Sequence, residues 1–110
     1  MATNNVLIKD LIDFGLSEKE AEIYIALLEL EVATVQEIAK KTGINRSSSY
    51  VVLESLKKKG LVGISEDKSI QQFFASSPEV LLRAASESAK KQSSMLERIE
   101  NIVPELKGFT

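Results

Sequence analysis

The chain has 110 residues, of which 44% are hydrophobic and 27% are charged, and its formal net charge is −2. This balance is typical of one globular domain with a single hydrophobic core, and it excludes a disordered or membrane-spanning chain. The sequence contains neither cysteine nor histidine, so disulfides, most zinc sites and imidazole catalysis are excluded. We therefore expect no enzymatic activity, no cofactor, no metal and no membrane partner. Because the first ten residues do not resemble a signal peptide, we expect a cytoplasmic location.

Charge is distributed unevenly along the chain. Residues 34–75 contain seven basic and four acidic residues, whereas the remainder contains seven basic and twelve acidic residues. A basic middle segment flanked by acidic ends is weak evidence for a surface that contacts nucleic-acid phosphates. Random surface charge gives the same count, so this pattern by itself leaves both interpretations open.

The first two predicted helices follow one another closely. Apolar residues from Val6 to Phe14 predict a short helix that ends at Gly15, because glycine tolerates a left-handed backbone. Ser17 and Glu20 then form a capping box, in which each side chain bonds the backbone amide of the other. We expect the second helix to run to about residue 30, with a buried stripe of Ala21, Tyr24, Ile25, Leu27 and Leu28.

The middle of the chain predicts a helix-turn-helix. A second capping box at residues 34–37 opens a short helix, which a turn at Gly43 ends. The next helix is expected to run from Asn45 or Arg46 to Lys59. Its core face is predicted to consist of Val52, Leu53 and Leu56. Two helices joined by a glycine turn are the sequence pattern of a helix-turn-helix.

After Gly60 the hydrophobic period changes. Residues 61–65 and 70–75 predict two short strands, and the polar residues 66–69 are expected to form the hairpin tip. A hairpin that directly follows a helix-turn-helix is the wing of a winged helix. The predicted fold is therefore mainly α with a small β-hairpin, a winged helix-turn-helix over residues 1–77.

A long helix is predicted for the remaining residues, 78–110. The sequence at 76–79, Ser-Ser-Pro-Glu, predicts a serine cap followed by a proline in the first turn. We expect the helix to end near Val103, because Pro104 has no backbone donor. Residues at alternating steps of four and three form a heptad seam: Leu81, Ala85, Ser88, Gln92, Met95, Ile99, Ile102 and Leu106.

The seam predicts a coiled-coil-like dimerisation helix, since so small a domain cannot cover a long apolar stripe. The alternative is that the helix packs back on Leu7, Leu11 and Leu27 of the same chain. In a two-fold dimer, two recognition helices lie about 34 Å apart, one turn of DNA, which predicts a pseudo-palindromic operator.

Four segments of the chain carry a family resemblance. They are FGLSEKEAEIYIALL at 14–28, EIAKKTGI at 37–44, RSSSY at 46–50 and LESLKKKGLV at 53–62. Together they resemble the TrmB family of archaeal and bacterial transcriptional regulators, with a more distant likeness to MarR-type regulators. The likeness is close to continuous over roughly residues 10–80. It implies a winged-helix fold, dimerisation and operator binding.

The chain also departs from that family. Ser48 stands where members often carry a basic residue, and Ser49 stands where they carry a small apolar one. The wing has Glu66-Asp67-Lys68-Ser69 in place of a Gly-Lys-Pro-like turn, and its two acids make a contact of Lys68 with phosphate doubtful. Family members carry a C-terminal effector domain that binds sugars, and the 110 residues contain no counterpart. Sugar sensing is therefore not expected, and any small-molecule effector is unassigned.

The candidate DNA-binding residues follow from the motif, because the start of the second helix of a helix-turn-helix enters the major groove. The candidates are Thr34, Gln36, Asn45, Arg46, Ser47, Ser48, Tyr50, Lys57 and Lys68. Arg46 is the best candidate for a bidentate contact with guanine. Backbone amides near Thr34 and Gln36 can meet phosphate at the positive end of the first helix.

Several candidates also have a structural interpretation, which the sequence leaves open. Asn45 can read adenine or cap its helix. Ser47 and Ser48 can donate to DNA or simply begin the helix, and Tyr50 can reach a phosphate or pack. The lysines at 57–59 can contact phosphate or complement the helix dipole.

Two functions are consistent with these observations. The first is a sequence-specific, homodimeric transcriptional regulator that binds double-stranded DNA. The alternative is a winged-helix protein–protein interaction module without direct DNA binding, which the acidic wing and the net negative charge favour.

Overall fold

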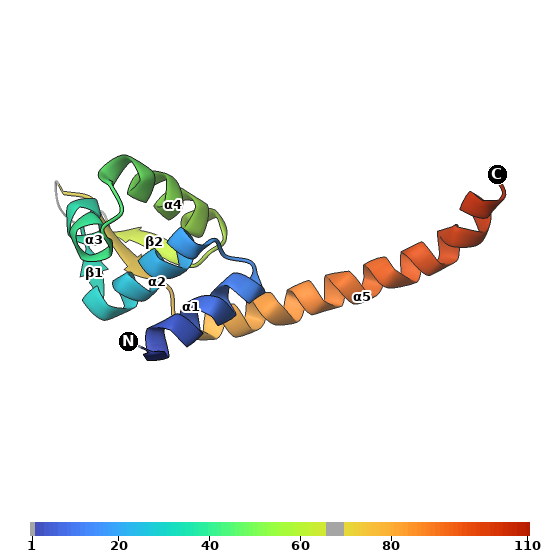
Figure 1. Cartoon of the computed structure of the whole chain (residues 1–110), viewed down its shortest axis with the longest axis horizontal. Helices are drawn as coiled ribbons and strands as arrows, with labels where there is room; N and C mark the ends of the chain where they lie inside the picture. The colour runs from blue at the N-terminus through green and yellow to red at the C-terminus, as the bar shows by residue number, and fades with distance from the viewer. Residues whose placement is uncertain (1, 66–69) are drawn as a thin grey trace. The chain divides into compact units, whose positions relative to one another are not determined.

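The computed structural model describes residues 2–65 and 70–110, and the chain divides into two compact units, Met1–Ser77 and Pro78–Thr110. The first unit contains α1 (Ala2–Phe14), α2 (Glu18–Leu30), β1 (Val32–Ala33), α3 (Val35–Thr42), α4 (Arg46–Lys58), β2 (Val62–Ser65) and β3 (Gln72–Ala75) (Figure 1). The second unit is α5 (Glu79–Lys107). This order confirms the predicted fold class, mainly α with a small sheet in a winged-helix arrangement. The predicted hairpin tip at 66–69 lies outside the described residues.

Both predicted capping boxes are present. In the first, the amide of Ser17 donates to Glu20 Oε1 at 2.8 Å and the amide of Glu20 donates to Ser17 Oγ at 3.1 Å. In the second, the amide of Thr34 donates to Glu37 Oε1 at 2.9 Å and the amide of Glu37 donates to Thr34 Oγ1 at 3.2 Å. Each box satisfies backbone donors that a helix start otherwise leaves unpaired, so α2 and α3 begin at defined residues.

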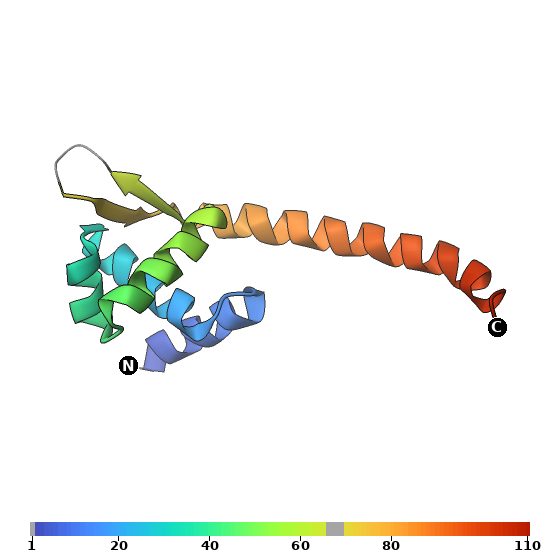
Figure 2. The same ribbon diagram turned by 90° about the horizontal axis from the view of Figure 1, so that it is seen from above.

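The turn between α3 and α4 depends on a glycine and an asparagine. Gly43 has φ +78°, a left-handed conformation that costs other residues about 1–2 kcal/mol. Two residues later, Asn45 Oδ1 accepts from the amide of Ser48 at 2.8 Å and thereby caps α4. These two residues set the direction of α4 relative to α3, as the helix-turn-helix pattern predicted. Figure 2 shows α3, the turn and α4 beside the hairpin β2–β3.

The core of the first unit is built around α2, which contacts α1, α3, α4, β1 and β3. Its largest fully buried side chains are Tyr24, Ile23, Leu27, Ile38, Leu53, Leu56 and Leu61. The predicted stripe of α2 was partly wrong, since Ile23 is fully buried and Leu28 is 39% exposed. Because neighbours surround α2 on several sides, its buried face is wider than a single stripe. This face includes Ile23, which the prediction omitted, and excludes Leu28, which the prediction included.

The sheet has three antiparallel strands in the order β1-β3-β2, one more than the predicted hairpin. The additional strand, β1, pairs Val32 with Phe74 and Ala33 with Phe73. Two residues carry no detectable alternation, so the sequence contained no signal for it. Glu31, with φ +68°, reverses the chain between α2 and β1. The third strand ties the wing to the helical part of the unit.

The second unit, α5, is a helix of 29 residues and therefore about 43 Å long. It runs through Pro104 to Lys107, so the predicted end near Val103 was wrong. Proline removes one backbone donor but leaves those of the following residues, and one further turn forms. The predicted serine cap was also wrong, because Pro78 occupies the cap position and the hydroxyl of Ser76 donates to the carbonyl of Gly60 at 2.9 Å. No helix within residues 2–65 and 70–110 is long and apolar enough to cross a membrane.

Candidate nucleic-acid interface

The residues of α4 that are buried in the core determine which of its residues face solvent. The buried face consists of Ser49, Val52, Leu53 and Leu56, and it includes the three core residues predicted from the sequence. Since successive helix residues are rotated by about 100°, the line farthest from the core has the spacing 47, 51, 54 and 58. All four of these residues are exposed: Ser47, Val51, Glu54 and Lys58. We call these four residues the outward line of α4.

The predicted DNA-binding residues on α4 flank or join this line. Arg46, Tyr50 and Lys57 are exposed and follow one another at helical spacing along one flank. Ser47 belongs to the outward line, whereas Ser48 is half-buried on the other flank. All five therefore belong to one helix, and four of them are exposed to solvent.

The remaining candidates lie elsewhere. Gln36 is exposed in the first turn of α3. The hydroxyl and amide of Thr34 are both bonded to the Glu37 carboxylate, and the Asn45 side chain caps α4. The capping interpretation is thus observed for Thr34 and Asn45. Lys68 lies outside the described residues.

Ser49 explains one departure from the family pattern. It is completely buried, at a position where the family resemblance implies a small apolar residue. Its hydroxyl donates to the carbonyl of Ile44 at 3.2 Å, so the buried oxygen has a partner. The bond joins the first turn of α4 to the chain just after the Gly43 turn.

A buried carboxylate joins the far end of α4 to the start of α2. Glu20 is 5% exposed, and besides capping α2 it accepts from Ser55 Oγ at 2.6 Å. Both of its oxygens also lie 2.9 Å from Lys59 Nζ. The sequence had identified Glu20 only as a capping residue, because no local pattern links it to residues 35 and 39 positions away. These contacts hold α4 along its axis and prevent it from sliding on α2.

The pKa of the Glu20 carboxyl reflects these partners. Burial raises it, but the amide of Ser17, the hydroxyl of Ser55 and the ammonium of Lys59 together lower it from 4.5 to about 2. The carboxylate is therefore ionised at all physiological pH values. Because Lys59 neutralises it, this lysine does not add a free positive charge to the end of α4.

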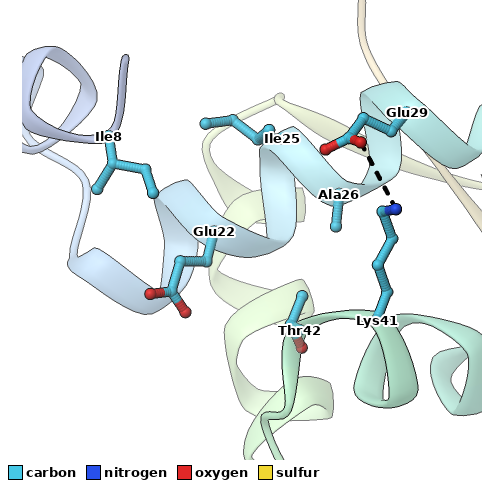
Figure 3. Close-up of a pocket in the computed structure, with 7 residues that line it drawn as sticks. All are labelled: Ile8, Glu22, Ile25, Ala26, Glu29, Lys41 and Thr42. Atoms are coloured by element: carbon cyan, nitrogen blue, oxygen red, sulfur yellow. Dashed lines mark ion pairs between the residues drawn. The ribbon is translucent and has the colours of Figure 1, made fainter. Parts of the chain in front are cut away.

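A second ion pair lies between α2 and α3, where a shallow hollow of about 340 Å³ is lined by Ile8, Glu22, Ile25, Ala26, Glu29, Lys41 and Thr42. Figure 3 shows Lys41 reaching from α3 toward Glu29 on α2, and the two charges are 3.5 Å apart. Both side chains are substantially exposed, so the pair contributes little stability. It does reduce the free positive charge of the basic middle segment, because its acid comes from outside residues 34–75.

A helix-turn-helix with an exposed second helix and a following hairpin defines the winged-helix class of domains. A family model described as "Sugar-specific transcriptional regulator TrmB" matches residues 11–79. The chain therefore belongs to the TrmB family of transcriptional regulators, as its sequence motifs had indicated. This membership places it among regulators and not among enzymes, which confirms that prediction.

Individual relatives agree with the family. The chain is 30% identical over 100 residues to the HTH-type sugar sensing transcriptional regulator TrmBL1 of Pyrococcus furiosus, covering 91% of this chain and 28% of that protein. The solved structure of TrmBL2, an archaeal chromatin protein that shows a novel mode of DNA binding, is similar with a TM-score of 0.85 and 25% identity. That match covers 97% of this chain and 42% of TrmBL2, so the chain spans less than half the length of either relative.

More distant structures share the fold. The multiple antibiotic resistance repressor MarR matches with a TM-score of 0.60 and 13% identity over 96% of this chain and 81% of MarR. A possible transcriptional regulator from Methanosarcina mazei Go1 matches with a TM-score of 0.63 and 12% identity, over 83% of this chain and 87% of that one. At such identities the likeness establishes the winged-helix fold alone.

The Glu20 contacts predict a specific pH dependence of stability. Because the folded-state pKa is lowered from 4.5 to about 2, the stabilisation is complete above pH 4.5 and is lost as the pH falls toward 2. We expect the unfolding free energy of the native chain to fall by on the order of 3 kcal/mol more than that of Glu20→Gln over this range. Urea unfolding at a series of pH values measures this difference.

Glu54→Gln is the matched control, since it removes an exposed carboxylate from α4. It should retain the full acid-dependent loss of the native chain. Parallel pH profiles for the native chain and Glu20→Gln would contradict the role assigned to Glu20.

Proposed function

We propose that this chain binds double-stranded DNA in a sequence-specific manner and regulates transcription, with α4 as the recognition helix in the major groove. The observation that supports this most directly is the exposure of α4. Arg46, Ser47, Tyr50 and Lys57 project from a helix whose opposite face is held in the core. Membership of the TrmB family and the DNA-binding relative TrmBL2 support the same function. A regulator of this kind acts where the DNA is, which we propose to be the cytoplasm.

Each exposed residue has a proposed role that follows from its position. Arg46, at the first position of α4, is suited to a bidentate contact with guanine. Ser47 and Tyr50 can donate hydroxyl hydrogens to bases or phosphates, and Lys57 can neutralise a phosphate near the end of the helix. Gln36, in the first turn of α3, is placed to contact the backbone that this helix crosses.

The alternative function, a winged-helix module that binds another protein, rests on charge. Two cations of the basic middle segment, Lys41 and Lys59, are paired with Glu29 and Glu20 from outside that segment. Fewer free positive charges are therefore available to attract phosphate. The salt dependence of binding separates the two functions, because only contact with DNA phosphates releases condensed counterions.

The DNA-binding proposal predicts the outcome of a selection experiment. Incubation of the protein with randomised duplex DNA, followed by repeated recovery and sequencing, should enrich a pseudo-palindromic motif with half-sites one helical turn apart. Affinity for the enriched site should fall steeply between 50 mM and 200 mM salt. A lack of enrichment together with salt-insensitive or absent binding would favour the protein-interaction module.

Substitution of Arg46 should reduce the affinity for DNA in a base-specific manner. Arg46→Ala should weaken binding to the selected site by about 1–3 kcal/mol and relax the preference at one guanine. Lys58→Ala, which removes a cation from the same helix, should weaken binding less and equally for all sequences. Fluorescence anisotropy titrations measure both losses, and equal losses for the two variants would contradict the role assigned to Arg46.

We further propose that α5 pairs with α5 of a second copy. None of its residues, all of which are described, is buried, although several are large and apolar. Met95, Ile99, Ile102 and Leu106 are 39–54% exposed and repeat at steps of four, three and four. The same seam continues toward the start of α5 through Leu81, Ala85, Ser88 and Gln92, and polar residues within a heptad seam favour one register over others. Such pairing supplies the two recognition helices that a pseudo-palindromic operator requires.

A charge within the seam should disrupt this dimer. In sedimentation equilibrium, the native 12.1 kDa chain should behave as a dimer, and Ile99→Glu should weaken association by about 100-fold or more, because it buries two like charges. Ser94→Glu introduces the same charge on the opposite side of α5 and should leave association unchanged. A native monomer, or equal association of all three proteins, would contradict pairing through this seam.

A further inference from the structure

We propose that Val51 determines sequence specificity by contacting the C5-methyl group of a thymine in the major groove. This inference rests on the proposed function, in which α4 is the recognition helix. It adds a residue that the sequence motifs do not indicate, and it assigns a particular base to that residue.

The position of Val51 follows from the packing of α4. It lies at the centre of the outward line, one turn after Ser47 and just under one turn before Glu54, on the side of the helix opposite Leu53 and Leu56. Its side chain is 70% exposed, the highest value among the large hydrophobic residues of the described helix-turn-helix, whereas the adjacent Val52 is buried. When the outward side of α4 enters a groove, Val51 therefore points toward the groove floor.

The chemistry of valine restricts what it can contact there. Its side chain has neither a donor nor an acceptor, so it cannot bond a phosphate or any polar base edge. Among the groups displayed in the major groove, the thymine methyl is the apolar one. Contact between Val51 and this methyl removes both from water, which is favourable in proportion to the apolar area buried.

Two further properties of the site support a close contact. Valine is branched at Cβ and has one strongly preferred χ1 rotamer in a helix, so its methyl groups are held in place before binding. The preceding turn of the outward line carries only the small side chain of Ser47, which allows the DNA to approach. A β-branched residue also lowers helix propensity, and at this exposed position no burial in the core compensates for that cost.

The charge of the neighbour Glu54 is better matched to base edges than to the DNA backbone. It is exposed three positions after Val51, and its carboxylate is repelled by phosphates. At a base edge, in contrast, a carboxylate can accept a hydrogen bond from the amino group of cytosine. The pair Val51 and Glu54 therefore suits the floor of the groove better than its phosphate walls.

The test compares the native chain with Val51→Ala on the same randomised duplex library. The native chain should enrich thymine at one position of each half-site, and Val51→Ala, which retains only the Cβ methyl, should weaken that preference while it keeps the others. In the selected site, replacement of this thymine by deoxyuridine, which lacks the methyl, should weaken binding of the native chain about fourfold per replacement. The same replacement should weaken binding of Val51→Ala clearly less than it weakens binding of the native chain.

Two controls keep the result interpretable. Val6→Ala makes the same substitution on α1, at another valine that is 60% exposed, and should leave base preference unchanged at every position. Alanine favours helix more than valine does, so Val51→Ala is expected to fold, and circular dichroism checks this.

The outcomes separate this inference from the proposed function. If the native chain enriches a motif but Val51→Ala keeps the same thymine preference, or if deoxyuridine weakens both proteins equally, the role of Val51 is overturned and DNA recognition by α4 stands. If Val51→Ala loses binding to all sequences equally, Val51 supports binding without reading a base, and the inference is also overturned. If the native chain enriches no motif, the proposed function fails, and the inference fails with it.

Discussion

The packing of α4 against α2 is the constraint on which the rest of the first unit depends. Four buried residues of α4 set its rotation about its own axis, and the contacts of Glu20 with Ser55 and Lys59 set its position along that axis. With the rotation and the axial position of α4 both held, the Cα–Cβ bond of each remaining residue points in a fixed direction. The surface of α4 that we propose for DNA binding is thus a consequence of what is buried beneath it.

Some charged residues of the first unit form ion pairs between its elements, and others are exposed on its surface. Glu20 and Glu29, both on α2, each pair with a lysine from later in the chain: Lys59, which follows α4, and Lys41 of α3. Glu20 is buried and has several hydrogen-bond partners, although Lys59 is 40% exposed, so these contacts position α4, whereas the exposed pair of Glu29 and Lys41 contributes little. The cations of α4 outside the two ion pairs are Arg46, Lys57 and Lys58, a modest set for the DNA binding that we propose. Under the proposed function, specific contacts at base edges contribute more to selectivity than overall attraction to phosphate.

Local patterns were sufficient where one segment makes its own structure. The two capping boxes and the Gly43 turn each involve residues a few positions apart, and they were predicted correctly. The Asn45 cap is equally local, and it was one of the two interpretations that the sequence left open for this residue. The errors came where local rules compete with distant contacts or carry too little information. The two residues of β1 are too few to show an alternation of apolar and polar side chains. Pro104 predicts the end of a helix, yet α5 continues past it.

By itself, the sequence determined the order of the helices and of the hairpin, the residues at which most of the helices begin and end, the core face of α4 and the family. These depend on short-range backbone chemistry and on recurring motifs. Only the tertiary structure decided which partner each distant residue has. Glu20 meets Lys59 across 39 positions, Val32 pairs with Phe74, and Val51 becomes the outermost apolar residue of α4. These relations depend on how helices and strands pack, and packing is decided by the whole buried core and not by any one segment.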